Sequence, residues 1–390
     1  MKRKLLLGLA ALAAACGGNV LDVGPPGSGG ADASPDPATP DAGDVVPWPL
    51  PGQRNARALT SEGAYLYWLA NQSAKHVLLR CEKADCGHTV TAVSRPAVNM
   101  TLLGFAIRGD MIYLVADTAF FSCPLADCSA PKLLVYDVKP IAAAFDDAHI
   151  YWSQQDVASG QVLNKILSCP LTGCAKPNLR LNGVMAVDLL VDDSRLYWIA
   201  GNTYPGISVR ISSMPKDGSG PVTHLVDGQN QLASFALHDG FVYFTTSTTL
   251  GTIARCPVTG CDASGPEVLA DRQNYPNFVN PSADGLFWMN GPAGPDIGRL
   301  DRPVQIVGCQ MPACGSSIET LDQGTGGGFA LRANAYWNGT DVPALPAREM
   351  VTDDDAIYWI GDLIGRAPPG QTSQKEIDAS IRRTEKRRIP

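Results

Sequence analysis

The 390-residue sequence has little of several features that would assign it to a familiar functional class. Only 18% of its residues are charged and the net charge is -7, which excludes a basic face for nucleic acid. Helical periodicity is scarce, and no apolar run after the N-terminal segment is long enough for a transmembrane helix. The five histidines fall at unrelated positions, and no nucleophile elbow, phosphate-binding loop or zinc-protease motif is present. The sequence therefore predicts no catalytic set, no metal site and no cofactor.

Cysteine, in contrast, is abundant and regularly placed. Ten of the eleven cysteines form five Cys-x4-Cys brackets: Cys81/Cys86, Cys123/Cys128, Cys169/Cys174, Cys256/Cys261 and Cys309/Cys314. Three brackets begin with Pro and end with Gly or Asp inside the cysteines, which is typical of a tight turn. Cysteines that flank such a hairpin loop should face each other across two strands, at a separation that suits a disulfide. We therefore predict five disulfides, each contributing about 2 kcal/mol to stability.

Zinc binding is the competing interpretation of the brackets. Two cysteines without a second pair make a poor zinc site, so disulfides are favoured. The fourth repeat carries the same turn without cysteines, at Ser213 to Gly218, which indicates that the hairpin is primary and the bridge reinforces it. Disulfides in turn imply an oxidising compartment.

Aromatic pairs mark an internal repeat along most of the chain. They are Tyr67-Trp68, Tyr113-Leu114, Tyr151-Trp152, Tyr197-Trp198, Tyr243-Phe244, Phe287-Trp288 and Tyr358-Trp359. Each pair lies in a short apolar run that favours a β-strand, and a turn precedes it. Four strands per roughly 45 residues is the unit of a β-propeller blade. The sequence predicts an all-β propeller of seven four-stranded blades over residues 51–370, with six or eight blades as alternatives.

Two segments complicate the repeat. An eighth pair, Tyr336-Trp337, is too close to the next one for a full blade, so we interpret residues 322–349 as an insertion. We expect residues 371–390 to form a basic, solvated C-terminal tail. The last blade is then incomplete, and residues 44–50 are a candidate for its outer strand, where proline is tolerated.

The strand and turn pattern resembles the YWTD-type propeller repeats of lipoprotein-receptor ectodomains. It is also similar to uncharacterised bacterial surface lipoproteins with Tyr-Trp and Cys-x4-Cys repeats. One departure is that the Thr-Asp after Tyr-Trp is absent, because the chain has Leu69-Ala70 and Ser153-Gln154 at these positions. YWTD propellers have six blades, so the resemblance implies the fold without fixing the number of blades.

Residues 1–15 resemble a bacterial lipoprotein signal peptide. A basic start is followed by an apolar stretch, Leu5 to Ala15, that is too short to span a bilayer. Cys16 would then be the lipidated N-terminus; the alternative is an Ala-x-Ala cleavage that leaves its thiol unmodified. Residues 16–50, rich in Gly, Pro, Ala and Asp, predict a flexible linker. Because Gly17 is not the Asp of an inner-membrane retention signal, we expect an outer-membrane anchor, with the body in the periplasm or outside the cell.

Loop lengths indicate where function is to be sought. In a propeller, the loops between second and third strands share one face with the interblade loops, and here these loops vary in length. Scaffolds carry binding sites on such variable loops. The largest departures are residues 290–307 and 322–349, and the candidate ligand contacts there are Asn290, Asp296, Arg299, Trp337 and Asn338. We predict a monomeric binding or scaffold module for a protein, peptide or glycan.

Two other functions remain open at this point. One is an envelope hydrolase or lyase with its site at the channel mouth, and the other is a purely structural envelope part. Acidic runs give no clear metal site: Asp353-Asp354-Asp355 resembles a calcium ligand set. However, Asp146-Asp147 and Asp192-Asp193 occupy the same column, where a tight turn favours Asp, so a structural role is preferred.

Overall fold

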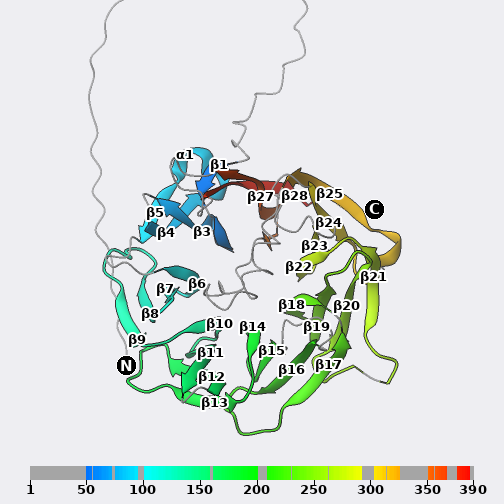
Figure 1. Cartoon of the computed structure of the whole chain (residues 1–390). Coiled ribbons are helices and arrows are strands. Elements are labelled where there is room, and N and C mark those ends of the chain that lie inside the picture. Colours follow the sequence, from blue (N-terminus) through cyan, green and yellow to red (C-terminus); the bar gives the residue numbers. More distant parts are fainter. Residues whose placement is uncertain are drawn as a thin grey trace, which may run out of the picture. The chain divides into compact units, whose positions relative to one another are not determined.

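The computed structural model is a ring of seven antiparallel sheets, each of four strands (Figure 1). The structure describes residues 50–386 except for 55, 73–74, 95–100, 159–160, 201–208, 230, 262, 292–302, 313, 326–349, 355 and 367–375. The ring confirms the predicted all-β propeller with seven blades, and the alternatives of six or eight are wrong. The predicted signal peptide, Cys16, most of the linker and the pair Tyr336-Trp337 lie outside the described residues. No helix within the described residues is long and apolar enough to cross a membrane.

The first four blades follow the chain in order, from the innermost strand outward. Blade 1 has β2 (Arg57–Glu62), β3 (Tyr65–Gln72), β4 (Lys75–Glu82) and β5 (Thr91–Ser94), with the short α1 (Cys86–Thr89) before β5. Blade 2 has β6 (Leu102–Arg108), β7 (Met111–Ala116), β8 (Ala119–Pro124) and β9 (Lys132–Tyr136). Blade 3 has β10 (Pro140–Phe145), β11 (His149–Ala158), β12 (Gln161–Pro170) and β13 (Asn178–Asn182). Blade 4 has β14 (Ala186–Val191), β15 (Arg195–Ala200), β16 (Val209–Pro215) and β17 (Thr223–Gln229).

Blades 5 and 6 continue this order, whereas blade 7 combines strands from the two ends of the chain. Blade 5 has β18 (Leu232–His238), β19 (Phe241–Thr246), β20 (Gly251–Pro257) and β21 (Glu267–Gln273). Blade 6 has β22 (Pro276–Ser282), β23 (Gly285–Asn290), β24 (Pro303–Cys309) and β25 (Glu319–Thr325). Blade 7 has β26 (Met350–Thr352), β27 (Ala356–Arg366), β28 (Glu376–Glu385) and, outermost, β1 (Leu50–Arg54). The ring is therefore closed by a strand from the other end of the chain.

The ring closure corrects two expectations about the chain ends. The described outer strand of blade 7 is β1, Leu50–Arg54, which extends past the predicted segment 44–50 and pairs with β28 from Leu50↔Ile381 to Arg54↔Asp378. The remaining residues of that segment lie outside the described residues. Within the segment assigned to a solvated tail, residues Glu376–Glu385 form strand β28, which pairs with β27 along its length. Its basic residues are accommodated because the Arg382 guanidinium lies 4.9 Å from the Trp359 ring centroid.

The aromatic pairs build the core because successive strand side chains point to opposite faces of a sheet. In blade 4, Trp198 packs into the cluster that contains Trp152 of blade 3. Its neighbour Tyr197 packs on the other side, with Phe235 and Phe244 of blade 5. The Trp members of the pairs are all less than 2% exposed: Trp68, Trp152, Trp198, Trp288 and Trp359. Each pair thus joins a blade to both of its neighbours.

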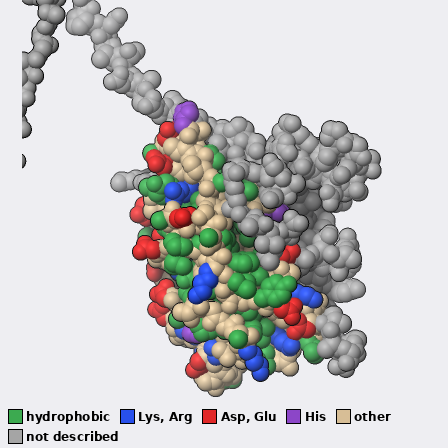
Figure 2. All heavy atoms as spheres, turned by 90° about the vertical axis from the view of Figure 1, so that its left-hand side faces the viewer, with side chains coloured by type: hydrophobic (Ala, Val, Ile, Leu, Met, Phe, Trp, Pro, Cys, Tyr) green, Lys and Arg blue, Asp and Glu red, His purple; other side chains and the backbone are tan. Residues whose placement is uncertain are grey.

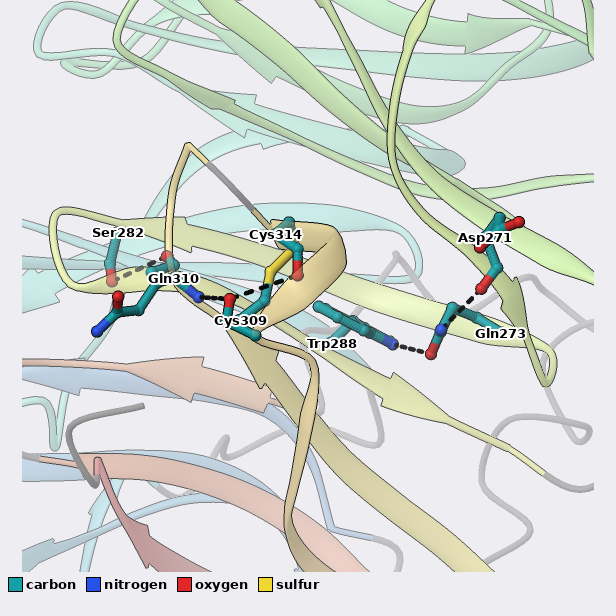
Figure 3. The surroundings of a disulfide bond; sticks show 9 residues. Asp271, Gln273, Ser282, Trp288, Cys309, Gln310 and Cys314 are labelled. Atoms are coloured by element: carbon teal, nitrogen blue, oxygen red, sulfur yellow. Dashed lines mark hydrogen bonds between the residues drawn. A yellow bond between two sulfur atoms is a disulfide. The ribbon is translucent and has the colours of Figure 1, made fainter. Parts of the chain in front are cut away.

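All five brackets are closed as disulfides, which confirms the predicted pairing. The bonds are Cys81–Cys86, Cys123–Cys128, Cys169–Cys174, Cys256–Cys261 and Cys309–Cys314. Their Cα–Cα separations lie between 4.8 and 5.8 Å, within the usual range for a disulfide. Figure 3 shows the last of them at the end of blade 6.

The second cysteine of each bracket does not lie where we expected it. The prediction placed the two cysteines across a pair of strands, and this is correct only for the first cysteine, which lies in the third strand of its blade. The second cysteines all precede the fourth strand: Cys86 begins α1, Cys314 begins a short 3-10 turn, and Cys128, Cys174 and Cys261 lie in connections outside any strand. The disulfide therefore fixes the turn to the end of the third strand.

A contact with the preceding blade explains this placement in blades 3 and 5. The backbone N–H of Cys174 donates to the carbonyl of Leu134 in β9 at 3.2 Å. The N–H of Cys261 donates in the same way to the carbonyl of Leu225 in β17, also at 3.2 Å. Because these N–H groups are bonded to the neighbouring blade, they are not used for pairing with the third strand of their own blade.

The hairpin without cysteines begins one residue later than expected. Leu196 pairs with Met214 in blade 4 as Ile150 pairs with Cys169 in blade 3. Met214 therefore occupies the place of a first bracket cysteine. Its side chain is buried in the same cluster as Cys169.

Candidate functional site

The strand order gives the ring two faces, which carry different sets of connections. Turns between first and second strands and hairpins between third and fourth strands open on one face, which we call the bracket face. Loops between second and third strands and between blades open on the other, which we call the loop face. Every blade places one exposed carboxylate at its first turn on the bracket face: Glu62, Asp110, Asp147, Asp193, Asp239, Asp284 and Asp354. Figure 2, a side view of the ring, shows acidic side chains gathered along one rim.

Asn290, a predicted ligand contact on the loop face, lies at the end of β23 and is only 8% exposed. Its Oδ1 accepts a hydrogen bond from Trp288 Nε1 at 3.1 Å, and its Nδ2 donates to Gln273 Oε1 at 3.0 Å. Trp288 Nε1 also donates to Gln273 (Figure 3). The Asn290 amide is therefore part of the blade 6 core, and we leave it out of any ligand-binding surface. The other predicted contacts lie outside the described residues: Asp296, Arg299, Trp337 and Asn338.

Asn290 lies two residues after Trp288 and accepts a hydrogen bond from its indole N–H, and the equivalent position can be compared in other blades. In blade 3 the equivalent residue is Gln154, whose Oε1 accepts from Trp152 Nε1 at 2.8 Å. In blade 4 the equivalent is Ala200, which has no side-chain acceptor. The buried Trp198 Nε1 accordingly has no hydrogen-bond partner within the described part of the chain. A buried donor without an acceptor costs stability.

Replacing Ala200 by Gln is therefore expected to raise the free energy of unfolding by about 1 kcal/mol, because it supplies this acceptor. For a domain of this size, the melting temperature should rise by about 2 °C. Calorimetry of the wild type and the variant measures the change. The control is Ala200→Gln in a Trp198→Phe background, where the gain should vanish. An equal gain in that background would show that the indole N–H is not involved.

A pocket of about 420 Å³ opens on the bracket face at the seam between blades 3 and 4. We call it the seam pocket. Its wall comes from three blades, and it is lined by Arg108, Phe145, Asp146, Asp147, Ala148, His149, Tyr151, Arg180, Val191, Asp192, Asp193, Lys216 and Asp217. Five of these residues are aspartates, whereas three carry fixed positive charge. Among its charged side chains, carboxylates therefore outnumber cations.

Asp146 is the central side chain of the seam pocket and is only 11% exposed. Its Oδ1 accepts from the backbone N–H groups of Ala148 and His149, at 2.9 and 2.6 Å. Its Oδ2 accepts from the Tyr151 hydroxyl at 3.0 Å and from Lys216 Nζ at 2.8 Å. Burial raises the pKa of this carboxyl, but the hydrogen bonds, that from Lys216 foremost, outweigh it and lower the pKa to about 2. Asp146 is thus ionised and fully bonded.

Asp192 repeats this arrangement one blade further on. Its Oδ1 accepts from the backbone N–H groups of Ser194 and Arg195, both at 2.7 Å. Its Oδ2 accepts from the Tyr197 hydroxyl at 2.6 Å. Burial raises the pKa of Asp192, but these hydrogen bonds outweigh it, and the net shift is downward. Burial and the bonded carboxylate raise the pKa of Tyr197. The turn role predicted for the first aspartate of each pair is confirmed.

The cations of the seam pocket are held by acceptors of the protein itself. Arg108 Nη2 donates to the backbone carbonyl of Phe145 at 2.9 Å. Arg180 donates from Nε to Ser168 Oγ at 2.8 Å and from Nη1 to the carbonyl of Asp217 at 2.6 Å. The exposed carboxylates at the rim are those of Asp147, Asp193 and Asp217. Of these, Asp217 already accepts hydrogen bonds at Oδ1 from the backbone N–H of Ser219 at 2.9 Å and from its hydroxyl at 2.7 Å. The pocket therefore offers acceptors to a ligand that brings hydrogen-bond donors or positive charge.

Sequence reasoning did not identify the seam pocket. The Asp-Asp turns were visible as a recurring column, and a lysine in the hairpin without cysteines was visible too. Nothing in one sequence places Lys216 beside Asp146, because the two belong to different blades.

Asp353, part of the run compared with a calcium ligand set, accepts from Ser61 Oγ at 3.0 Å and from Lys83 Nζ at 2.6 Å. Within the described ranges, no three His, Cys, Asp or Glu side chains group as metal ligands.

No family model and no curated protein matches this sequence. Solved structures do match its fold. The nidogen/laminin complex matches with a TM-score of 0.43 at 14% identity, over 70% of this chain and 92% of that one. A putative TolB from Agrobacterium tumefaciens matches with a TM-score of 0.43 at 20% identity, over 61% of this chain and 86% of that one. One of two prolyl endopeptidases matches with a TM-score of 0.52 at 16% identity, over 70% of this chain and 42% of that one.

At these identities a structural match bears on the fold alone. The seven four-stranded sheets arranged in a ring place the chain in the class of β-propeller proteins. The propeller fold expected from the YWTD resemblance is confirmed by these seven four-stranded sheets.

Proposed function

We propose that this protein is a lipid-anchored binding module of a bacterial cell envelope, which captures a protein, peptide or glycan. The basic and apolar segment before Cys16 supports the anchor. The five disulfides fit an oxidising compartment such as the periplasm or the cell surface. A ring of clamped blades supports a binding role, because a preorganised surface loses little entropy when a partner docks.

The observation that carries the binding role is the seam pocket. Its cations are bonded internally, while exposed carboxylates from two blades stand at its rim. A partner that brings amino or guanidinium groups, such as a lysine-containing or arginine-containing peptide or an amino sugar, complements these carboxylates. On the loop face, Asp296, Arg299, Trp337 and Asn338 remain proposed contacts of a second surface.

Site-specific photocrosslinking in the host cell tests this function. A photoreactive amino acid is placed at position 193 on the pocket rim, at 338 on the loop face, and at 133 on an outer strand as a control. Leu133 is half exposed on the outer strand of blade 2 and is not among the residues that line the seam pocket. We expect a discrete adduct from position 193, and we expect its loss when Asp147→Lys reverses the charge beside it. Equal labelling at all three positions, or an adduct that survives Asp147→Lys, would contradict capture by the pocket.

The same adducts separate the remaining possibilities. A discrete adduct from position 338 alone would assign capture to the loop face. Under the enzymatic alternative, a hydrolase or lyase at the channel mouth, the partner would be recovered in cleaved form. A purely structural envelope part would give no discrete adduct from either surface.

A further inference from the structure

Lysine occupies one register position in three blades. It follows a first bracket position by two residues: Lys83 after Cys81, Lys216 after Met214 and Lys386 after Thr384. These first positions are equivalent, because each pairs with the residue before the Tyr of its blade. In the other four blades the same position is apolar: Leu125, Leu171, Val258 and Met311. We call the three lysines the latch lysines.

Each latch lysine reaches an aspartate in the first turn of the preceding blade. Lys83 Nζ lies 2.6 Å from Asp353 Oδ2, which joins blade 1 to blade 7. Lys386 Nζ lies 3.0 Å from Asp284 Oδ2, which joins blade 7 to blade 6. Lys216 makes the same contact across the seam of blades 3 and 4. The latch lysines therefore fasten blades to one another, whereas each bracket disulfide joins two residues of one blade.

The lysine side chains of the two latches beside blade 7 are well enclosed, whereas the carboxylate partner Asp284 is 58% exposed. The Lys386 side chain is 8% exposed and its Nζ lies 5.3 Å from the Phe287 ring centroid. The Lys83 side chain is 18% exposed and its Nζ lies 5.9 Å from the Tyr358 ring centroid. A partly buried cation that loses its carboxylate has little water to replace it, so removing one partner of such a pair is costly. The Lys83–Asp353 contact, in which both side chains are less than 20% exposed, is accordingly stronger than a pair at an open surface.

Blade 7 lacks a bracket disulfide and has a short inner strand, so contacts from neighbouring blades matter most for it. Its third strand has Thr384 at the position where five other blades have a cysteine, so it carries no bracket disulfide. Its outer strand β1 pairs only with β28 within the described sheet, and it comes from the opposite end of the chain. Its inner strand β26 has three residues. Local opening begins where few strand pairs hold an element in place.

We infer that the latches of Lys83 and Lys386 form a closing device for the ring, and that the ring opens at blade 7 when they are broken. Opening separates β1 from β28 and leaves the paired edge of β28 exposed. The pairing of β1, the strand that follows the N-terminal linker, therefore depends on the lysine–aspartate contacts on the bracket face. It is independent of whether the seam pocket binds a partner.

Hydrogen exchange measured by mass spectrometry tests the closing device on the full folded protein. In Lys83→Met and Lys386→Met, amide exchange in β1 and β28 is expected to rise at least tenfold, with blades 2 to 5 unchanged. The matched control is Lys216→Met, which breaks the same contact far from blade 7 and should leave β1 and β28 within twofold of the wild type. Unchanged exchange in β1 and β28 after both blade 7 substitutions would overturn the inference, as would equal acceleration by Lys216→Met.

A second pair of variants keeps the test decisive if a methionine variant fails to fold. Asp284→Lys alone should accelerate exchange in β28, because it places two cations together. Combining it with Lys386→Asp should restore protection to within twofold of the wild type. Failure of the exchanged pair to restore protection, in a folded protein, would show that the contact does not hold blade 7.

Discussion

Replacing Asp146 by alanine is expected to lower the free energy of unfolding by about 3 kcal/mol. The substitution removes the acceptor of four hydrogen bonds in one step. It leaves the Tyr151 hydroxyl and the Lys216 ammonium half-buried without their carboxylate, and it frees two turn N–H groups. Urea unfolding followed by tryptophan fluorescence measures the loss, provided that the transition is two-state.

The neighbouring residue provides the control for this prediction. Asp147 is exposed at the rim of the same turn, so Asp147→Ala is expected to change stability by less than about 0.5 kcal/mol. A loss of the same size in both variants would show that charge on the bracket face, and not the bonded geometry, determines the effect.

The Asp146 prediction also has a defined pH dependence. The pKa of Asp146 in the folded protein is about 2, below its ordinary value of 3.8. The unfolded chain therefore binds the proton first as the pH falls, and stability from this group is lost between about pH 4 and pH 2. The difference between the wild type and Asp146→Ala should be constant above pH 5 and should shrink toward pH 2. A difference that grew on acidification would contradict the bonded, ionised state.

Reduction of the five bracket disulfides is the second change with a large expected effect. Each closes a short loop and contributes about 2 kcal/mol, so together they supply up to about 10 kcal/mol. This approaches the whole stability of an ordinary domain, about 5–15 kcal/mol. We expect the reduced and alkylated protein to unfold near room temperature, whereas the oxidised protein stays folded. Circular dichroism on heating measures the difference.

Blade 4 offers a matched control for the effect of reduction. Met214 lies in the register of a first cysteine, and Ser219 stands where the second cysteine would be. The double substitution Met214→Cys and Ser219→Cys should therefore form a sixth bracket, which adds about 2 kcal/mol that reduction removes. If reduction left the melting temperature of the wild type unchanged, the brackets would not be the clamps described here.

The fold was largely predictable from the sequence because it repeats. Buried aromatic pairs such as Tyr197-Trp198 must recur once per blade, since they join each blade to both neighbours, and the turns before them are fixed by Asp side chains. The bracket pairs were predictable for the same reason, because the turn brings the two cysteines together locally. Such local and periodic constraints leave a clear pattern in a single sequence.

The exact position of the second bracket cysteines was less predictable. Cys128, Cys174 and Cys261 lie in connections, whereas the expectation of a tight hairpin had the two cysteines of a bracket face each other across two strands. In two of these brackets the cysteine N–H is bonded to a carbonyl of the preceding blade. The turn residues inside a bracket carry no information on such a contact with another blade.

The chain ends were not predictable from the repeat either. Blade 7 combines strands from both ends, and its basic strand β28 looks like a charged tail when it is taken alone. The guanidinium of Arg382 is in fact covered by Trp359 and bonded to Asp322 of blade 6. Hydropathy does not reveal that a basic residue has an aromatic and a carboxylate partner in the folded ring.

The candidate sites show the same limit. Asn290 follows an aromatic pair and precedes a long loop, which favoured a ligand contact, yet its register beside Trp288 makes it an internal acceptor. The seam pocket depends on Asp146 and Lys216, which lie 70 positions apart in the sequence and meet only when blades 3 and 4 pack together. A pattern of spacing within one blade does not indicate which side chains will meet between blades.

We propose that a propeller clamped by bracket disulfides is anchored at Cys16, and mass spectrometry of the protein purified from host membranes without reduction is the decisive test. We predict an N-terminal peptide that begins at a lipid-modified Cys16, together with five disulfide-linked peptides that each join the two cysteines of one bracket. An unmodified Cys16, or cysteines that are free or linked between brackets, would contradict the account.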